Sequence, residues 1–431
     1  MTAADVHPVQ SPSRPARVLW FTSRPLPAVT ERLGRPARGS GYWISALMQA
    51  VRSRCGLQMS VATIRPGSGG LHFNDGGVEH FIIGQGRLAH KLGRLDALRR
   101  CRAIVDQWQP DLIHVHGTET VYGLLATQVS CPVVISLQGF LTAYRQHFWG
   151  SLSTWDILRA HSLGELLRGR GLYWQWRALA RGERRERRIL SGARLVMGRT
   201  DWDRAQARRF NPSVTYCHVG EILRPSFYAG RWDPARADRH SLIFTNAGSP
   251  CRGAETLLRA AALLRPRWPG ITVRLGGELG GAYRGFLERL ARRLGLSGRV
   301  EMPGYLSEQD LSRALLRSHV FVLPSHNENS PNSLAEAMLL GMPCVAGRAG
   351  GVPSMVEEGR TGLLFGPGEP AVLAERLGAV LGDESLALSL GQAARTEARA
   401  RHDPDRVVAQ LLEAHEQALG RPLRNQEGGA A

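Results

Sequence analysis

The stretch HNENSPNSLAEAMLLGMPCVAG, residues His326–Gly347, carries the clearest folding signals of the chain. It directly follows HVFVLPS (His319–Ser325), an apolar run with the length and composition of a buried strand. Ser330 is a favourable helix N-cap, Pro331 suits the first helical position, and Gly341 marks the helix end. The pattern predicts a strand, a turn and a helix, the repeating unit of a parallel α/β sheet. The helix N-terminus then lies at the carboxyl end of the strand, where such sheets bind ligands.

Two glutamates stand eight residues apart in this stretch. Glu328 precedes the predicted helix, and Glu336 lies roughly one and a half turns inside it. Free amides of Asn332, Ser333 and Leu334 at the positive helix end would suit a diphosphate. A stray loop charge and a carboxylate favoured by the helix dipole would explain the two glutamates separately. Their combination with the strand–turn–helix unit favours a ligand that carries both hydroxyls and phosphate.

The alternation of strands and helices extends over most of the 431 residues and restarts once. We therefore expect an α/β fold of two Rossmann-like domains, with mainly parallel sheets that face each other across a cleft. The expected bounds are 16–225 for the first domain, 240–400 for the second, and 403–420 for a C-terminal helix that packs back on the first domain. The segment Arg224–His240 reads as an irregular linker. The apolar runs that predict strands are 16–22, 57–64, 79–84, 112–117, 132–139 and 194–200 in the first half, and 241–248, 271–277, 299–305, 319–325, 343–347 and 361–365 in the second.

The composition is strongly basic, with a formal net charge of +18 and Lys91 as the only lysine. Such an excess favours acidic partners: nucleic acid, anionic lipid or phosphorylated small molecules. The six cysteines form no C-x-x-C pair, which indicates neither a disulfide framework nor a zinc site. No secretory signal is recognisable, and no apolar run approaches the ~20 residues of a membrane span. We expect a cytoplasmic protein that at most lies on the inner face of the plasma membrane.

The E-x7-E spacing is followed by AMLLGMPCVAGRAGGVPSMVEEGRTGLLF (Ala337–Phe365). This whole run resembles the retaining glycosyltransferases of family 4, which have the GT-B fold, and the resemblance extends over nearly the full chain. It implies a nucleoside-diphosphate sugar held mainly by the second domain and an acceptor held mainly by the first, with no metal and no cofactor. It also implies that Glu328 and the amides after it contact the donor sugar and phosphate, and that Glu336 binds the ribose hydroxyls.

A second phosphate-binding element is expected in FTNAGSPCRGAETLL (Phe244–Leu258). The resemblance places Arg252 where the family usually has a lysine, so that Arg252 and Glu328 are the expected catalytic residues. Gly248 and Ser249 of the same loop are expected to bind the donor. An ordinary surface arginine at a helix start is the alternative for Arg252. The family's usual arginine a few residues earlier is missing, and Ala247 or a neighbour stands in its place.

The first domain contributes further candidates that rest on the same resemblance. ARGSGYWISAL matches the glycine-rich loop after the first strand, where backbone can approach a phosphate closely. Gln138 stands where many members of the family have a histidine at the sugar pocket. His114 and His116 share one strand face, but no third ligand is evident, so we reject a metal site. Likewise, Thr200 and Asp203 predict a capping box rather than a metal-binding D-x-D. The expected donor-binding residues here are Ser40, Gly41, Gln138 and Arg199, and the expected acceptor-side residues are His116, Gly117 and Tyr144.

The segment Tyr144–Arg188 is rich in tryptophan, arginine and leucine. Aromatic side chains beside arginines fit peripheral contact with an anionic membrane near a lipid-linked acceptor. An amphipathic helix with a solvated charged face is the alternative. We keep both.

The resemblance therefore implies a retaining hexosyltransferase-type glycosyltransferase, and its match around RTDWDRA and ENSPNSLAEAM suggests bacterial surface-polysaccharide assembly, in capsule, exopolysaccharide or lipopolysaccharide synthesis. The acceptor would be a glycan or a lipid-linked glycan. A nucleotide-sugar epimerase or hydrolase on the same fold is the alternative. A nucleic-acid-binding protein is a third reading, which we rank below these because no nucleic-acid motif is recognised and the arginines are spread over both domains.

Overall fold

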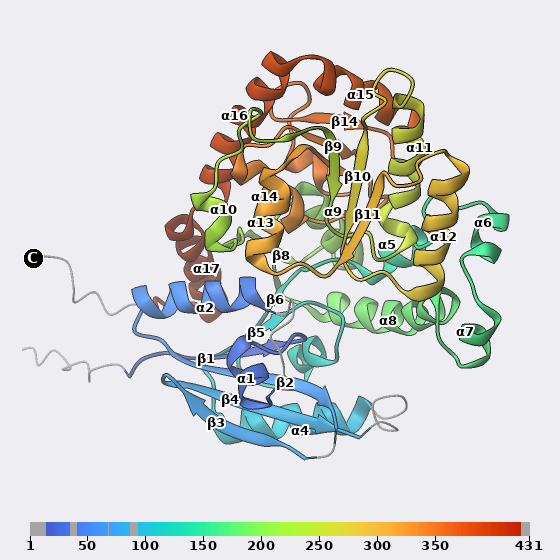
Figure 1. Cartoon of the computed structure of the whole chain (residues 1–431). Coiled ribbons are helices and arrows are strands. Elements are labelled where there is room, and N and C mark those ends of the chain that lie inside the picture. The colour runs from blue at the N-terminus through green and yellow to red at the C-terminus, as the bar shows by residue number, and fades with distance from the viewer. Residues whose placement is uncertain (1–13, 35–40, 68, 87–93, 424–431) are drawn as a thin grey trace, which may run out of the picture.

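The computed structural model describes residues 14–34, 41–67, 69–86 and 94–423. These residues form two α/β domains, which lie one above the other in Figure 1. Each domain has a sheet, and helices that cover its faces join most of the strands, as the apolar runs predict. The predicted fold class, two Rossmann-like domains with mainly parallel sheets, is confirmed.

The first domain contains an eight-stranded sheet in which one edge strand, β3, is antiparallel to its neighbour and the others are parallel. The central strands β1 and β5 are almost wholly buried because helices cover both faces of the sheet. In sheet order the strands are β3 (Leu71–Asp75), β4 (Val78–Gln85), β2 (Gln58–Pro66), β1 (Arg17–Thr22), β5 (Leu112–His116), β6 (Val133–Ser136), β7 (Leu195–Gly198) and β8 (Thr215–His218).

The second domain contains a six-stranded sheet in which every pair is parallel. Its central strand β12 is buried at every position, which explains the uninterrupted apolar sequence. In sheet order the strands are β11 (Val300–Gly304), β10 (Thr272–Gly276), β9 (Asp238–Phe244), β12 (Ser318–Leu323), β13 (Cys344–Gly347) and β14 (Leu363–Phe365).

The helices follow the strands in alternation. None in the described part of the chain is both long and apolar enough to cross a bilayer. Those between the strands of the first sheet are α1 (Pro27–Arg32), α2 (Tyr42–Arg54), α4 (Arg94–Trp108), η1 (Tyr122–Thr127), α5 (Leu141–Gln146), α6 (Thr154–Arg159), α7 (Leu163–Leu167), α8 (Leu172–Gly192) and α9 (Asp201–Phe210). Those that follow are α10 (Pro225–Ala229), η2 (Pro250–Arg252), α11 (Ala254–Leu264), α12 (Gly281–Arg293), α13 (Glu308–Leu316), α14 (Asn332–Leu340), η3 (Val352–Ser354), α15 (Pro370–Gly382), α16 (Glu384–Arg401) and α17 (Pro404–Leu419).

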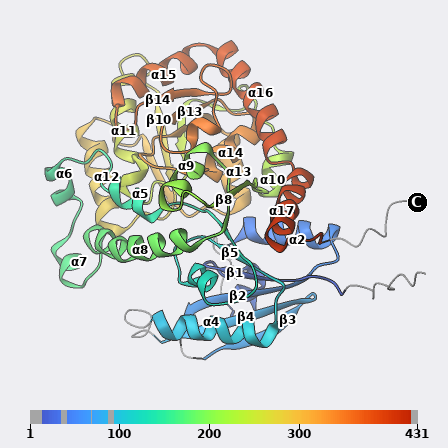
Figure 2. The same ribbon diagram turned by 180° about the vertical axis from the view of Figure 1, so that it is seen from behind.

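Two parts of the chain cross from one domain to the other. The C-terminal helix α17 leaves the second domain and lies beside α2 of the first, as Figures 1 and 2 show from opposite sides. Its apolar face joins the core under the first sheet through Val407, Val408, Leu411 and Leu412. In the opposite direction, the segment between β6 and β7 packs Phe148 into the core of the second domain, together with Leu152, Ala160 and Leu172.

The observed local structure differs from the expected one in two respects. The irregular linker Arg224–His240 contains the helix α10, and the strand β9 already begins at Asp238. The edge strands β3 and β8 were not predicted, because neither has a long apolar run. Edge strands pair on one side only, so that their sequences carry a weaker pattern. The capping box of Thr200 and Asp203 at the start of α9 is confirmed.

The docking of α17 predicts that the last helix stabilises the first domain. Leu411→Ala removes a fully buried side chain from the core between α17 and the first sheet. We expect it to lower the free energy of unfolding by about 2–5 kcal/mol, measured by urea denaturation. The exposed Glu413 on the same helix serves as the control. Glu413→Ala is expected to stay within about 0.5 kcal/mol of wild type, and an equal loss in both variants would contradict the assigned packing.

Candidate active site

The carboxyl ends of the two sheets meet through hydrogen bonds between the domains. Asn329, in the turn after β12, accepts a hydrogen bond from Thr200 Oγ1 at 3.0 Å, and its side-chain amide donates to the Leu137 carbonyl at 3.4 Å. Beside this contact, the Asp201 amide donates to Ser354 Oγ at 3.1 Å. The loop that contains Glu328 therefore lies directly at the domain interface, where doubly wound sheets bind ligands.

The helix α14 begins one residue later than expected and is capped differently. Pro331 occupies the N-cap position with an extended backbone, and Ser330 turns its hydroxyl towards Met355 Sδ at 3.6 Å. The predicted Ser330 cap is therefore wrong. The expected free amide of Leu334 is also wrong, because it donates to the Pro331 carbonyl at 3.1 Å within the first turn.

The amides of Asn332 and Ser333 have no acceptor among the described residues, and both side chains are half-buried. These two N–H groups lie at the positive end of the helix macrodipole. These two N–H groups are therefore the part of the predicted anion site that the hydrogen bonds of the helix do not occupy.

Arg252 and Glu328, the two expected catalytic residues, form an ion pair. Ser325 Oγ donates to the same carboxylate oxygen at 2.8 Å. The guanidinium carbon of Arg252 lies 5.0 Å from the ring centroid of Tyr144, which belongs to α5 of the first domain. Both charged side chains are largely buried, with exposed fractions of 15% and 8%. The structure thus brings together one predicted acceptor-side residue and both predicted catalytic residues, across the two domains.

Glu336 is held by an arginine that the sequence analysis did not select. Arg224 donates to Glu336 Oε1 from Nε at 2.9 Å and from Nη2 at 2.7 Å. Burial raises the pKa of Glu336 to about 7, while the positive charge of Arg224 opposes that shift. Oε2 takes no part in the pair with Arg224, so that this carboxylate can accept a further hydroxyl. Arg224 lay in the expected linker, and no spacing rule connects it to a helix more than a hundred positions away.

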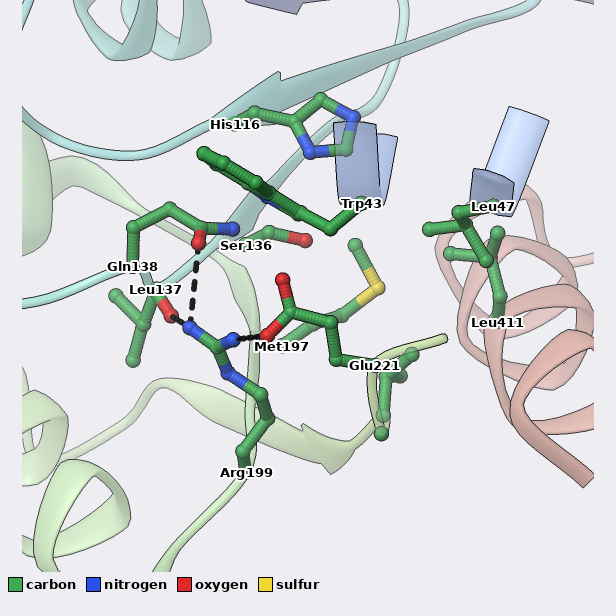
Figure 3. A pocket seen from close by; sticks show the side chains of 12 residues that line it. Trp43, Leu47, His116, Ser136, Leu137, Gln138, Met197, Arg199, Glu221 and Leu411 are labelled. Atoms are coloured by element: carbon green, nitrogen blue, oxygen red, sulfur yellow. Dashed lines mark hydrogen bonds and ion pairs between the residues drawn. The ribbon is translucent and has the colours of Figure 1, made fainter. Parts of the chain in front are cut away.

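A small cavity lies at the carboxyl end of the first sheet, with a volume of about 30 Å³. Figure 3 shows Arg199 reaching three acceptors at its wall. The guanidinium pairs with Glu221 and donates to the Leu137 carbonyl at 3.1 Å and to Gln138 Oε1 at 3.2 Å. Two predicted donor-binding residues, Gln138 and Arg199, are therefore hydrogen-bonded to each other. Glu221 was not predicted, because it lies beyond β8 in a stretch without a recognisable motif.

His116 forms the opposite wall of this cavity, with its ring above Trp43 in Figure 3. Burial lowers the pKa of His116 to about 3, so that the imidazole is neutral. Its Nε2, the Trp43 indole nitrogen and Glu221 Oε1 are buried and have no hydrogen-bond partner in the described part of the protein. A space of this volume can hold a water, and these three atoms offer it both donors and acceptors.

Two of the predicted loops contain a glycine at a position where a side chain would not fit. Gly41 has a φ of +70° at the N-cap of α2, and a Cβ there would lie 3.1 Å from the Pro25 carbonyl oxygen. Gly117 has a φ of +89°, and a Cβ would overlap the Glu119 carboxylate. Both positions therefore require glycine. Ser40 lies outside the described residues.

The loop after β9 brings the remaining candidates near Arg252. Ser249 is the N-cap position of η2, which contains Arg252. Gly248 lies so close to the Glu278 carbonyl oxygen that a Cβ would approach it to 2.8 Å. Ala247 is fully buried in the second core, so that its place in this loop is a packing position. No cluster of three or more His, Cys, Asp or Glu side chains suited to a metal ion occurs within the described ranges.

Comparison with known proteins matches each of the two domains to a family model. Residues 38–220 match the family model described as "Glycosyl transferase 4-like domain", and residues 233–397 match "Glycosyl transferases group 1". A D-inositol 3-phosphate glycosyltransferase of Corynebacterium urealyticum is 32% identical over 184 residues, which is 42% of this chain and 42% of the relative. The sulfoquinovosyl transferase SQD2 of Arabidopsis thaliana is 26% identical over 68% of this chain and 54% of its own length. The chain thus spans about half the length of these curated relatives.

Solved structures agree with the fold over nearly the whole chain. Sucrose-phosphate synthase from Thermosynechococcus elongatus superimposes with a TM-score of 0.73 at 18% identity, covering 94% of this chain and 99% of the other. HepE from Anabaena, in complex with UDP-glucose, gives a TM-score of 0.67 at 19% identity, covering 93% and 99%. Two facing parallel-sheet domains of this kind define the GT-B fold. Within that fold, the two parts of the chain, residues 38–220 and 233–397, each match a glycosyltransferase family model.

The raised pKa of Glu336 predicts a pH-dependent contribution to stability. Below the ordinary pKa of 4.5 the carboxyl is protonated in both folded and unfolded states, so burial is not opposed by charge. As pH rises through about 7, the folded state must also ionise Glu336, and this contribution is lost. Between pH 5 and pH 8 we expect wild type to lose about 2–3 kcal/mol relative to Glu336→Gln. Urea denaturation of wild type and of Glu336→Gln at pH 5 and at pH 8 measures this loss. A constant difference at both pH values would contradict the shift.

The Arg199–Glu221 pair predicts a coupled effect on folding. Both side chains are buried, so Arg199→Gln leaves the Glu221 carboxylate without its counter-charge. We expect the single variant to lose about 3–5 kcal/mol, and Arg199→Gln/Glu221→Gln to lose less than the sum of the two single changes. Thermal and urea denaturation of wild type, the two single variants and the double variant give the coupling energy by a double-mutant cycle. Arg208→Gln, an exposed position on α9, is the control for removing a charge. Additive losses would mean that the pair is not coupled.

Proposed function

We propose that this chain transfers a hexose from a nucleoside diphosphate to an acceptor hydroxyl, with retention at the anomeric carbon and without a metal ion. The observation that carries the proposal is the Arg252–Glu328 pair just before α14, with Tyr144 of the other domain against it. It supplies a cation for a diphosphate and a carboxylate for sugar hydroxyls at one interdomain position.

Each charged group has a distinct role in this proposal. The two unused amides of α14 and the Arg252 guanidinium bind the diphosphate. Glu328 accepts hydrogen bonds from the sugar hydroxyls, and Oε2 of Glu336 accepts one from the ribose. A carboxylate beside a diphosphate would repel it. Here Arg252 and Ser325 already compensate Glu328, and Arg224 compensates Glu336, so that this repulsion is reduced.

The proposed reaction takes place on one face of the sugar. The bond between the anomeric carbon and the phosphate oxygen breaks, and the acceptor oxygen forms a bond to the same face. The acceptor proton passes to the departing diphosphate oxygen. Arg252 and the N-terminus of α14 stabilise the negative charge that develops there, because they are already fixed in orientation. No covalent intermediate on the protein is required.

The relatives guide the choice of substrates to test. The solved HepE complex contains UDP-glucose, which makes UDP-glucose the first donor to try. The curated relatives are named for an inositol phosphate acceptor and for sulfoquinovosyl transfer. We propose a glycan or lipid-linked glycan as acceptor, in cytoplasmic assembly of a bacterial surface polysaccharide. The resemblance around RTDWDRA (Arg199–Ala205) and ENSPNSLAEAM (Glu328–Met338) supports this assignment.

Kinetics of two site variants test the proposal, after a thermal-shift panel of nucleotide sugars has identified the donor. Arg252→Ala is expected to lower kcat about 10²–10³-fold, because it removes a fixed cation from the leaving group. Glu336→Ala is expected chiefly to raise the donor KM, because it removes a ribose contact that is equally strong in the ground state and in the transition state. The anomeric configuration of the product, read by NMR, tests retention.

Arg293→Ala is the matched control for Arg252→Ala, since Arg293 is exposed on α12 and pairs with no described residue. It should leave kcat and KM unchanged. Unchanged kinetics in both site variants would refute the assigned site. Consumption of the donor at the same rate with and without acceptor would instead favour the hydrolase alternative.

A further inference from the structure

An exposed apolar tip projects from the region between β6 and β7. Six of the nine large hydrophobic side chains that are exposed in the described part of the protein lie within α6, α7 and the first turn of α8. Isolated exposed leucines are normal on soluble proteins, but such a concentration in a short segment marks an interaction surface. We call this set the apolar tip: Trp155, Leu158, Leu163, Leu167, Tyr173 and Trp174, exposed by 70%, 61%, 73%, 79%, 37% and 39%.

The tip is built from three helices that follow one another in the chain. Trp155 and Leu158 are three residues apart on α6, so they share a helix face, as do Leu163 and Leu167 on α7. Trp174 Nε1 donates to the Leu166 carbonyl at 3.0 Å, which fixes the start of α8 against α7. In Figures 1 and 2 the helices α6 and α7 lie at the outer edge of the molecule, away from both sheets.

A row of arginines continues from this tip along α8. Arg177, Arg181, Arg184 and Arg188 are spaced by four, three and four residues, so they lie on one face of the helix, which also includes Trp174. We call these four the basic stripe. Three of them, Arg181, Arg184 and Arg188, line a hollow of about 310 Å³ together with Arg185 and the apolar side chains of Leu98, Val121 and Leu124.

Charge on this surface is mainly positive, although the half-buried Glu165 lies on α7 between Leu163 and Leu167. Every exposed charged residue between 153 and 192 is an arginine. Three of the four acidic residues of the same segment are paired within the fold: Asp156 with Arg259 at 3.1 Å, Glu183 with Arg145 at 3.0 Å, and Glu186 with the Leu141 and Thr142 amides. The guanidinium groups of Arg181, Arg184 and Arg188 bind no described side chain or carbonyl. Their charge is therefore available to an anionic partner.

We propose that the apolar tip and the basic stripe together dock this protein on an anionic phospholipid surface. Aliphatic and indole side chains gain free energy when they enter the boundary between headgroups and acyl chains, and arginines pair with the lipid phosphates. Nucleic acid fits less well, because exposed leucines neither stack on bases nor bond to phosphate. The hollow, with apolar walls and arginines at its rim, matches one acidic amphiphile.

The docking surface is tied directly to the candidate active site. Glu186 on α8 is fully buried and accepts hydrogen bonds from the Leu141 amide at 2.8 Å and from the Thr142 amide at 2.9 Å. Those residues begin α5, which carries Tyr144 against Arg252. A bilayer bound along α8 is therefore held at a fixed position relative to the site, as a lipid-linked acceptor requires. This last step rests on the proposed function; the docking itself does not.

Vesicle co-sedimentation of the full chain tests the docking. The probes are phosphatidylcholine vesicles with and without phosphatidylglycerol, at low and high salt. Wild type is expected to sediment with the anionic vesicles only, and less at high salt. Arg177→Gln/Arg181→Gln/Arg184→Gln/Arg188→Gln is expected to weaken this binding by more than about tenfold. Leu163→Ser/Leu167→Ser, which changes no charge, should weaken it as well.

The matched control is Arg208→Gln/Arg209→Gln/Arg292→Gln/Arg293→Gln, which removes four other exposed arginines and gives the same net charge. It should bind vesicles like wild type. An equal loss in this control would reduce the effect to overall charge and overturn the proposal, as would a wild type that stays in the supernatant. Binding of RNA that the stripe variant loses, with vesicle binding unchanged, would overturn it in favour of nucleic acid.

Donor binding measured in solution separates this proposal from the proposed function. The stripe variant keeps the Arg252–Glu328 pair, so its thermal shift with the donor should match wild type. A protein that docks on vesicles but responds to no nucleotide sugar would retain the docking surface and lose the proposed function. A protein that binds a donor but no vesicle would retain the proposed function and lose the docking surface.

Discussion

Burying a charge demands an opposite charge beside it, and this constraint shapes the contact region between the two domains. Glu328 is buried with Arg252, Glu336 with Arg224, and Glu221 with Arg199. In each pair the arginine and the carboxylate come from different segments of the chain, so that the pair fixes both backbones. A carboxylate left alone at such a place would cost several kcal/mol, on the order of 3–5. The site is therefore built from compensated charges that are already oriented.

The same region is held by chain segments that exchange between domains. Phe148 and Leu172 come from between strands of the first sheet but pack in the second core. Leu411 comes after the second domain and packs against the first. Each exchange buries apolar surface against the other domain, so the two sheets cannot separate without exposing it.

Local order in the sequence explains which features could be predicted. The strand β12, the helix α14 and the capping box at Thr200 each follow from neighbouring residues, because their signals lie within a few positions. The proximity of Arg252 to Glu328 came from a family resemblance rather than from spacing. Arg224 and Glu221 could not be found, since an ion pair between distant segments leaves no periodic trace. Ser330 shows the converse: a good local cap lost to a tertiary contact with Met355.

The positive balance of the chain also has a structural explanation. Arginines inside the domain contact are neutralised by the carboxylates they hold, so they add little to the external field. Along α8 the arrangement is opposite: Glu183 and Glu186 are spent on inward contacts, whereas Arg181 and Arg184 face outward. The outer face of α8 is therefore positive, because the acidic side chains of this helix make contacts within the fold. A basic composition alone names no partner, but an arginine-lined face of α8 that begins at the exposed Trp174 fits the proposed docking on an anionic surface with an apolar interior.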